Sequence, residues 1–392
     1  MSLYHINRFF AVAILVLLGS QFVPLEASDS TCAGQWDALF TRTEGWLGAD
    51  GIYSIDLSYD AETGKSDSSS DQRLFWFSDT FFGETHENGD EYGKRGLVNH
   101  SFAILTGKSP LSNKIEFFYS KDANKDKHKG ENIIPGKYWL QDGMRYGDHV
   151  WLSAILVGRA WKPDRIDAVS INLDPSTGRP DFNTATVDPD ARLSLKRADA
   201  QLAWGAAILD DADDGYIYVY GYVDRFREFS RKDMVVARVP RARFEDYGEW
   251  RYYDNGAWTP DATPSFSKEN TLVRNVSTEF SVSRIPSGKE RGKYLLVYTP
   301  GVISPALAYR IGETPIGPFG EEQIFYRSSV PQELPSVKCY NGKAHPTFSN
   351  AEGILVSYNV NRLGELARKP SEYRPRFVWL RWAELVGESS EH

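Results

Sequence analysis

The stretch Asp50-Gly-Ile-Tyr-Ser-Ile-Asp-Leu is followed by Arg73-Leu-Phe-Trp-Phe-Ser-Asp and then by Ser101-Phe-Ala-Ile-Leu. Each of these segments is a short apolar or aromatic run, and polar turn residues separate one run from the next. Runs rich in β-branched and aromatic residues between turn signals are typical of strands. The three segments therefore predict one antiparallel unit of three or four short strands.

The same unit recurs about every seventy residues, which is a period typical of repeat folds. The five opening strands are expected at Asp50-Gly-Ile-Tyr, Gly136-Lys-Tyr-Trp-Leu-Gln-Asp, Trp204-Gly-Ala-Ala-Ile-Leu, Glu279-Phe-Ser-Val-Ser-Arg-Ile and His345-Pro-Thr-Phe. Helical periodicity is scarce along the chain. Five such units predict an all-β fold, a five-bladed β-propeller in a single domain.

The N-terminus has the pattern of a secretory signal peptide over residues 1–28. Arg8 supplies a positive charge, Phe9 to Gly19 form a short apolar segment, and Ala27 precedes the expected cleavage site. An uncleaved N-terminal anchor is the alternative. The propeller domain is then expected over residues 29–386 and a disordered tail over residues 387–392, in a secreted or periplasmic protein.

The composition of the 392 residues narrows the class of partner. The net charge is −8 and no basic stripe appears, so we expect neither nucleic acid nor, after signal removal, a membrane as a partner. We expect the protein to be a monomer. The two cysteines, Cys32 and Cys339, can pair in an exported protein, or they can be two free buried thiols.

Acidic residues follow two of the early strands, in Gly48-Ala-Asp50-Gly and in Phe77-Ser-Asp79-Thr-Phe. In a propeller the first strand of each blade lines a central channel, and the residues that begin it face one mouth. Asp142 and Glu279 occupy such positions in later units. Because charge is costly to bury, converging carboxylates point to a function, and they are the equipment that splits glycosidic bonds. Turn-capping aspartates and an exposed edge glutamate are the structural alternatives.

The order of these motifs resembles that of the five-bladed glycoside hydrolases, the arabinanases, xylosidases and fructosidases. It is more similar to an incompletely characterised family of exported bacterial propellers, some of which cleave D-arabinan. The matching stretches are Glu44-Gly-Trp-Leu-Gly-Ala-Asp-Gly-Ile-Tyr-Ser, Leu74-Phe-Trp-Phe-Ser-Asp-Thr-Phe, Tyr138-Trp-Leu-Gln-Asp-Gly, Trp204-Gly-Ala-Ala, Thr278-Glu-Phe-Ser-Val, Ala344-His-Pro and Val356-Ser-Tyr-Asn.

The resemblance implies roles for the carboxylates. Asp50 corresponds to the base or nucleophile and Glu279 to the general acid, whereas the D-arabinan-cleaving relatives imply that Asp50 and Asp79 are the key pair. The third opening strand carries Trp204 and Gly205 where many such enzymes have an aspartate, and Asp142 is the candidate to replace it.

Several other residues are candidates for contact with a sugar. Trp46, Trp139 and Trp204 can stack on a sugar ring or fill the core, and Asn99 and His100 can bond hydroxyl groups. His345 can contact sugar, orient a carboxylate, bind a central ion or be structural. No cofactor is firmly implied, although a calcium ion in the central channel is compatible with this pattern.

The sequence thus predicts an exported glycoside hydrolase that acts on a furanose-containing or related polysaccharide or oligosaccharide. The alternative is a non-catalytic carbohydrate-binding propeller, and a scaffold for a protein partner is a third reading. The chain contains no His-Glu-x-x-His, Gly-rich phosphate loop or Gly-x-Ser-x-Gly elbow, which disfavours metalloprotease, nucleotide-dependent and serine-hydrolase chemistry.

Overall fold

The computed structural model of this chain describes most of the sequence. The described residues are 30–67, 70–112, 114–120, 132–159, 163–210, 213–226, 232–362 and 367–387, with the backbone alone for 30–32 and 112. The expected signal peptide and residues 388–392 lie outside them. Within the described part, no helix is long and apolar enough to span a bilayer.

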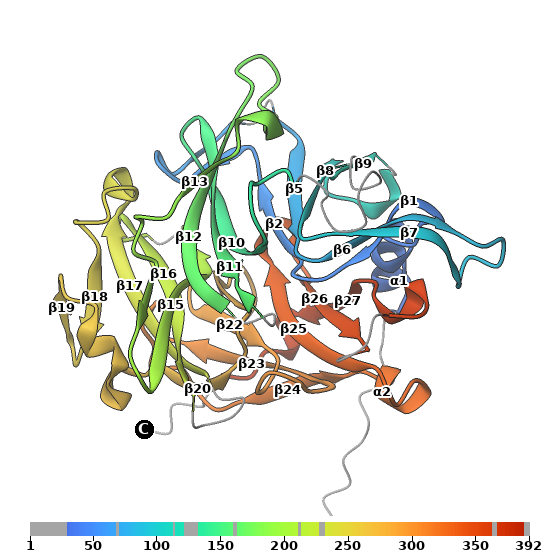
Figure 1. The fold of residues 1–392 in the computed structure, drawn as a ribbon. Helices are drawn as coiled ribbons and strands as arrows, with labels where there is room; N and C mark the ends of the chain where they lie inside the picture. Colours follow the sequence, from blue (N-terminus) through green and yellow to red (C-terminus); the bar gives the residue numbers. More distant parts are fainter. Residues whose placement is uncertain are drawn as a thin grey trace, which may run out of the picture.

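Five antiparallel sheets follow one another along the chain, and in each the strands pair largely in sequence order (Figure 1). Their strands are β2 (Tyr53–Asp56), β5 (Gln72–Phe77), β8 (Ser101–Thr106) and β9 (Ile115–Phe118); β10 (Tyr138–Tyr146), β11 (His149–Val157), β12 (Pro163–Asn172) and β13 (Thr186–Asp188); β14 (Ser194–Lys196), β15 (Ala200–Leu209), β16 (Tyr216–Arg225), β17 (Lys232–Pro240), β18 (Arg251–Asp254), β19 (Ala257–Thr259) and β20 (Val273–Val276); β21 (Phe280–Arg284), β22 (Tyr294–Tyr298), β23 (Ala306–Gly312) and β24 (Gln323–Arg327); and β25 (Lys338–His345), β26 (Gly353–Asn361) and β27 (Arg376–Arg381).

The strands β2, β10, β15, β21 and β25 form a closed ring. Each contacts the next one along the chain, and β25 contacts β2. Apart from two α-helices and short 3-10 turns, the regular structure of the described residues is β-sheet, so the predicted all-β class is confirmed. The helices are α1 (Ser30–Leu39) and α2 (Val330–Glu333).

The strand predictions are accurate where apolar runs are strong, and the one opening strand that they misplace is that of the fifth unit, whose other two strands begin at Gly353 and Arg376 as expected. Residues 149–157 and 294–298 form β11 and β22 as expected. The opening strand of the fifth unit, however, ends at His345 instead of beginning there, because β25 spans Lys338–His345. Its first six residues, Lys-Cys-Tyr-Asn-Gly-Lys, are too polar to be recognised as a buried strand.

A further sheet that the sequence did not predict lies beside the ring. It contains β1 (Glu44–Ala49), β6 (Thr80–Thr85) and β7 (Tyr92–Val98), and β1 pairs with β6 so that Ala49 faces Thr80. A small pair, β3 (Tyr59–Asp60) and β4 (Lys65–Ser66), lies between β2 and β5 in sequence. The pairing of β1 with β6 brings the two acidic motifs together.

Three strands of the ring carry an irregularity in their pairing. Gln141 and Asp142 in β10 stand opposite one residue of β11, and Asn341 and Gly342 in β25 stand opposite one residue of β26. In β15, Gly205 and Ala206 have no residue opposite them in β16. Such bulges redirect side chains and are common beside functional sites.

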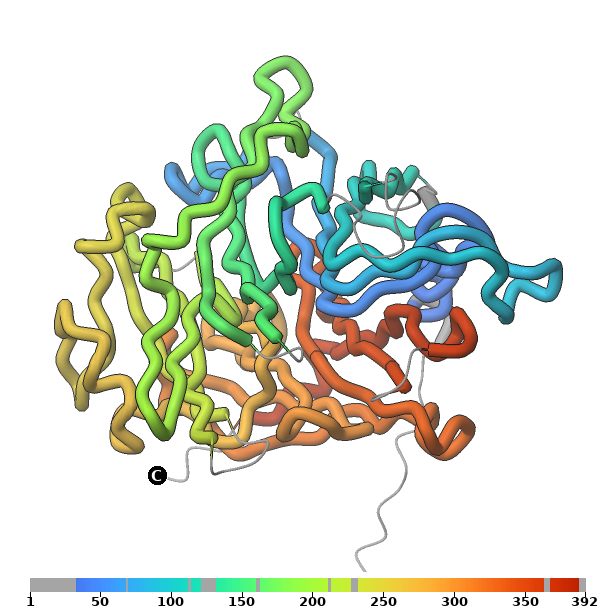
Figure 2. The backbone as a smooth tube through the Cα atoms, in the orientation of Figure 1, coloured from blue at the N-terminus to red at the C-terminus, as the bar shows by residue number. Residues whose placement is uncertain are grey.

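The beginning of the chain closes against its end. Helix α1 contacts β27, where the Phe377 backbone N–H donates to Asp37 Oδ1 at 2.9 Å. Phe40 stacks on Phe377 with ring centroids 5.3 Å apart. Figure 2 shows the blue N-terminal segment beside the red C-terminal one.

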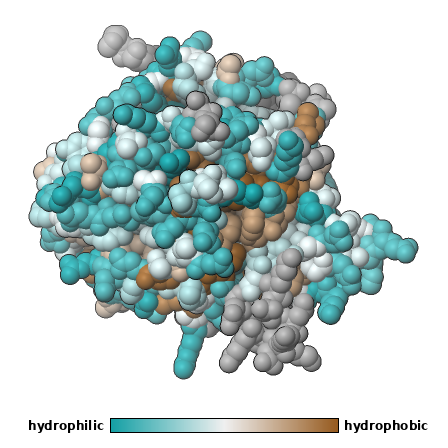
Figure 3. Space-filling model, turned by 90° about the horizontal axis from the view of Figure 1, so that it is seen from above, coloured by the Kyte–Doolittle hydropathy of each residue, from teal (hydrophilic) through white to brown (hydrophobic). Residues whose placement is uncertain are grey.

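The high aromatic content is used mainly in the core. Six tryptophans are fully buried, namely Trp36, Trp46, Trp76, Trp151, Trp204 and Trp250. On the face seen in Figure 3, apolar residues gather near the middle and hydrophilic residues surround them. Aromatic abundance alone therefore says little about sugar stacking in this chain.

Cys339 is buried in β25 and forms no disulfide with a described residue, and burial raises the pKa of its thiol. The side chain of Cys32 lies outside the described part of the chain. A disulfide between the two cysteines stays a prediction.

The turn between β1 and β2 requires a glycine at position 51. Gly51 has φ +60°, a left-handed conformation that costs other residues about 1–2 kcal/mol. A Cβ atom here would also lie 2.5 Å from Ser78 Oγ. The Gly51 N–H donates to Asn359 Oδ1 at 3.2 Å, which fixes the turn against β26.

We expect Gly51→Ala to lower the free energy of unfolding by the cost of the left-handed conformation and by about 1–3 kcal/mol more for the steric clash. Gly178→Ala is the matched control, since Gly178 has φ +66° and no described atom within 4 Å of its added Cβ. Urea unfolding of both variants measures the difference. An equal loss in the two variants would contradict the proposed close contact with Ser78.

Candidate functional site

Asp50 and Asp79 are held side by side by their own backbones. The Asp50 N–H donates to the Asp79 carbonyl at 3.3 Å, and the Ser78 N–H donates to the Asp50 carbonyl at 2.8 Å. This junction continues the β1–β6 ladder by one residue pair. These bonds bring together two aspartates that are more than twenty residues apart in the sequence.

The pKa of the Asp50 carboxyl is shifted further than that of Asp79. The Tyr340 hydroxyl donates to its Oδ2 at 2.7 Å, whereas its Oδ1 is buried and has no hydrogen-bond partner among the described residues. Burial, followed by the charges of Asp79 and Glu279, raises the pKa of Asp50 to about 8. The hydroxyls of Tyr340 and Tyr373 partly oppose this rise.

The pKa of Asp79 is less perturbed, because the charge of Lys137 lowers it, whereas neighbouring carboxylates raise the pKa of Asp50. Asn99 Nδ2 donates to its Oδ1 at 2.9 Å, and Tyr373 donates to its backbone carbonyl at 3.0 Å. Burial raises the pKa of the Asp79 carboxyl to about 6, while hydrogen bonds from Asn99 and Trp139 limit the rise.

Glu279 precedes β21 and has donors on both oxygens. Asn341 Nδ2 donates to its Oε1 at 2.7 Å, and Lys343 Nζ pairs with its Oε2. Burial raises the pKa of Glu279, and the charge of Lys343 opposes that rise. Since Glu279 in turn raises the pKa of Asp50, the three carboxylates form one electrostatic group.

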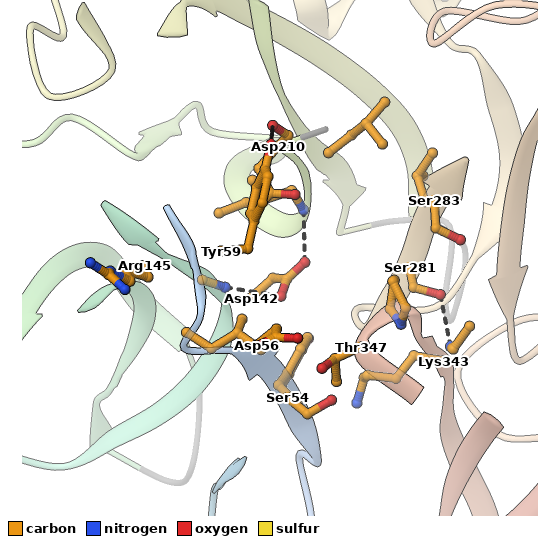
Figure 4. Close-up of a pocket in the computed structure, with 18 of the residues that line it drawn as sticks. Ser54, Asp56, Tyr59, Asp142, Arg145, Asp210, Ser281, Ser283, Lys343 and Thr347 are labelled. Atoms are coloured by element: carbon orange, nitrogen blue, oxygen red, sulfur yellow. Dashed lines mark hydrogen bonds between the residues drawn. The ribbon is translucent and has the colours of Figure 1, made fainter. Parts of the chain in front are cut away.

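Asp142 lies in the bulge of β10, and two backbone N–H groups hold it (Figure 4). Gly143 N donates to its Oδ1 at 2.9 Å and Ile208 N to its Oδ2 at 2.7 Å. Burial raises the pKa of Asp142 to about 7, and the charge of Lys343 is among the effects that lower it.

A cavity of about 300 Å³ lies along the later halves of the ring strands. Tyr53, Asp142 and Lys343 line it, whereas Asp50, Asp79 and Glu279 are not among its lining residues. The polar and charged residues labelled around it in Figure 4 are Ser54, Asp56, Tyr59, Asp142, Arg145, Asp210, Ser281, Ser283, Lys343 and Thr347. Asp142 and Lys343 therefore stand between this cavity and the other carboxylates.

Of the candidate sugar contacts, the structure brings only Asn99 and Trp139 to the carboxylates. Both are partly exposed and both bond to Asp79. Trp46 is buried against Phe40, Phe77 and Phe117, and its Nε1 donates to Ser101 Oγ. Trp204 is buried against Tyr252.

The two candidate histidines are buried and neutral. His345 Nδ1 bonds to Ser54 Oγ and Nε2 to Ser357 Oγ, both at 2.8 Å, and burial lowers its pKa to about 3. His100 Nε2 accepts from Ile134 N at 2.9 Å, and burial lowers its pKa to about 4. Neither ring presents a surface to the carboxylate group in this structure.

Four residues of the site escaped the sequence reasoning. Tyr340, Asn341 and Lys343 come from the first six residues of β25, where a polar run directly precedes Ala344-His345 and could have been recognised as the start of the fifth opening strand. Tyr373 lies after a 3-10 turn, and no local pattern marks it.

The described residues contain no cluster of three or more His, Cys, Asp or Glu side chains that could hold a metal ion. The oxygens of Glu279 and Asp142 already accept hydrogen bonds from Asn341, Lys343 and two backbone N–H groups. A calcium ion needs six to eight oxygen ligands, so these residues do not fit one.

The arrangement is suited to acid–base chemistry. Two neighbouring carboxyl groups with separated pKa values can hold one proton between them near neutral pH. Glu279 and Asp142 add negative charge nearby, which could stabilise a positively charged transition state.

Comparison with known proteins gives a fold and a family. No curated protein matches the chain. A solved structure from Bacteroides ovatus, provisionally named a hydrolase, is similar with a TM-score of 0.65 at 18% identity, covering 88% of each chain. At this identity the likeness establishes the fold alone.

Two enzymes resemble the chain more remotely. The GH43_1 enzyme from Xanthomonas citri, complexed with xylotriose, has a TM-score of 0.45 at 12% identity, covering 89% of this chain and 92% of the enzyme. The α-L-arabinofuranosidase from Lactobacillus brevis has a TM-score of 0.43 at 9% identity, covering 88% and 97%. Likeness at this level carries no functional argument.

One family model matches nearly the whole described chain, over residues 34–382. Its span includes all four candidate carboxylates and the complete ring of strands. The chain belongs to this family, which is described as a domain of unknown function, DUF5005.

Proposed function

We propose that the chain is a glycoside hydrolase whose five consecutive sheets are the blades of a five-bladed β-propeller. The closed ring of β2, β10, β15, β21 and β25 supports this arrangement, with those strands lining the channel. The reaction centre is the carboxylate group of Asp50, Asp79 and Glu279 at the end where the ring strands begin.

The observation that carries the proposal is the difference between Asp50 and Asp79. The two carboxyl groups interact, and burial raises the pKa of Asp50 to about 8 and that of Asp79 to about 6, so the pair holds one proton near neutral pH; the charges of Asp79 and Glu279 favour Asp50 as the group that holds it. Asp50 is thus the general acid that protonates the leaving oxygen, and Asp79 is the base or nucleophile. These roles differ from the family resemblance, which implies that Asp50 is the base or nucleophile.

Glu279 and Asp142 support the reaction electrostatically. Both oxygens of each group accept hydrogen bonds, which favours the ionised form and leaves neither group oriented as a proton donor. Glu279, which pairs with Lys343, and the ionised fraction of Asp142, whose pKa is raised to about 7, supply negative charge that favours the oxocarbenium-like transition state of glycoside cleavage. Glu279 is then neither the acid nor the nucleophile.

The substrate is a furanose-containing or related polysaccharide, and export would place the enzyme in contact with it. Asn99 and Trp139 are the first candidates for contact with a sugar, since both are partly exposed and bond to Asp79. The predicted signal peptide supports a secreted or periplasmic location for the enzyme, and its monomeric state stays a prediction.

The first test is hydrolysis of a panel of arabinans, arabinogalactans and fructans. We expect the wild type to release sugars, and we expect Asp50→Asn and Asp79→Asn each to lower kcat by about 10²–10⁴-fold, the range for loss of a general acid or base. Reducing-sugar release and product chromatography measure the rates.

Asp148→Asn is the matched control, because its side chain is 98% exposed on a hairpin turn. It should leave turnover unchanged. If the wild type binds a glycan but releases no product, the carbohydrate-binding alternative replaces the proposal. Full activity in Asp50→Asn would remove the role assigned to that residue.

A second test uses the pH profile of kcat/KM. Activity requires ionised Asp79 and protonated Asp50, so it should rise with pH through about 6 and fall through about 8. The Tyr340 hydrogen bond favours the ionised form of Asp50. Tyr340→Phe should therefore raise the pKa of Asp50 and move the alkaline limb upward by about one pH unit.

Tyr358→Phe serves as the control for this substitution, since its hydroxyl bonds to Ser328 and Tyr326 away from the carboxylates. Its profile should match that of the wild type. An alkaline limb that does not move, or that moves downward, in Tyr340→Phe would mean that another group is the acid.

A further inference from the structure

Lys343 places one positive charge between carboxylates of two other sheets. Its side chain is 1% exposed, and its Nζ pairs with Glu279 Oε2 beside β21. The same charge lowers the pKa of Asp142 in β10. The ammonium also lies 4.1 Å from the centroid of the Tyr53 ring in β2, a geometry that favours a cation.

The bulge in β25 places this group. Asn341 has φ +56° and Gly342 donates its N–H to Thr299 Oγ1 at 2.8 Å, so the chain turns before the ladder resumes at Lys343 and Ser357. A Cβ at position 342 would lie 2.5 Å from Leu307 Cδ2, which leaves room for glycine alone. The result is that Asn341 and Lys343 both reach Glu279.

The ammonium and a metal ion would exclude one another at this point. A divalent cation between Glu279 and Asp142 would need the oxygens that now accept from Lys343, Asn341, Gly143 and Ile208. It would also lie beside the positive charge of Lys343, which is unfavourable at short range.

We infer that the Lys343 ammonium is the built-in cation of the channel, which takes the place of a bound metal ion and holds Glu279 ionised and in position. Lys343 is therefore a positioning residue that acts through Glu279. The consequence for stability does not depend on the proposed hydrolase activity, whereas the consequence for turnover rests on it.

The first experiment measures the thermal unfolding of the wild type in EDTA and in millimolar CaCl₂. Because the cation is covalently part of the chain, we expect the same Tm in both solutions. A Tm that falls in EDTA and is restored by calcium would overturn the inference, since the channel would then hold a metal ion.

The second experiment removes the ammonium and returns it from solution. Lys343→Ala should lower the folding equilibrium constant by about 100-fold or more, as expected when one partner of a buried pair is lost. Propylammonium has the atoms that the substitution removes, and the adjacent 300 Å³ cavity, which Lys343 lines, gives it a way in. It should raise the Tm of the variant, whereas propanol, which has the same shape without the charge, should not.

Lys232→Ala is the matched control, because Lys232 is also largely buried, pairs with Asp224 at 2.6 Å and lies near the Tyr222 ring. Propylammonium should raise the Tm of Lys232→Ala no more than propanol does. If Lys343→Ala does not fold, Lys343→Met, which retains the apolar stem and removes only the charge, is measured instead, and we expect it to unfold at a lower Tm than the wild type.

Two further results would overturn the inference. One is equal rescue of Lys343→Ala by propylammonium and propanol, which would mean that Lys343 only fills space. The other is a Lys343→Met variant with wild-type stability. If the cation rescues stability but the wild type cleaves no glycan, the inference holds and the proposed function fails.

Discussion

The site depends on two backbone hydrogen bonds, which join the turn after β1 to the turn after β5. They fix Asp50 and Asp79 as neighbours before any side chain is considered. The close approach needs glycines on both sides of Asp50, since a Cβ at Gly48 would lie 2.5 Å from the Tyr373 carbonyl and one at Gly51 would collide with Ser78. Two adjacent, desolvated carboxyl groups then cannot both ionise easily, and from this constraint the acid–base behaviour follows.

Local sequence signals explain which parts of the fold could be predicted. β11 and β22 are continuous apolar runs between turns, and propensity suffices to find them. β25 was misplaced because its first six residues are polar and bulged, so its burial comes from the ring and not from its own composition. The sheet of β1, β6 and β7 could not be predicted, since β1 and β6 are separated by β2 and β5 and no local pattern records their pairing.

Only those residues of the candidate site that have a local sequence signal could be predicted. Asp50, Asp79 and Glu279 were found because a charge next to a buried strand is locally conspicuous, whereas Asp142, expected at the start of its strand, lies in the middle of β10. The residues that control them were missed because they act over long sequence separations, 64 residues for Lys343 with Glu279, 290 for Tyr340 with Asp50 and 294 for Tyr373 with Asp79. Trp46 and Trp204 were candidate sugar contacts, but both are buried in the core. A tryptophan next to a catalytic candidate has the same local sequence whether it contacts sugar or fills the core.

The closure of the ring determines when this centre can exist. Asp50 meets its Tyr340 partner across 290 residues, and Tyr373 reaches Asp79 across 294. Contacts at such separations form late, because the entropy of closing the intervening loop must be overcome first. A nascent or truncated chain that lacks the last sheet would have the two aspartates but not their controlling hydroxyls. The acid–base pair is thus completed only when folding is, and its titration would report on the integrity of the whole molecule.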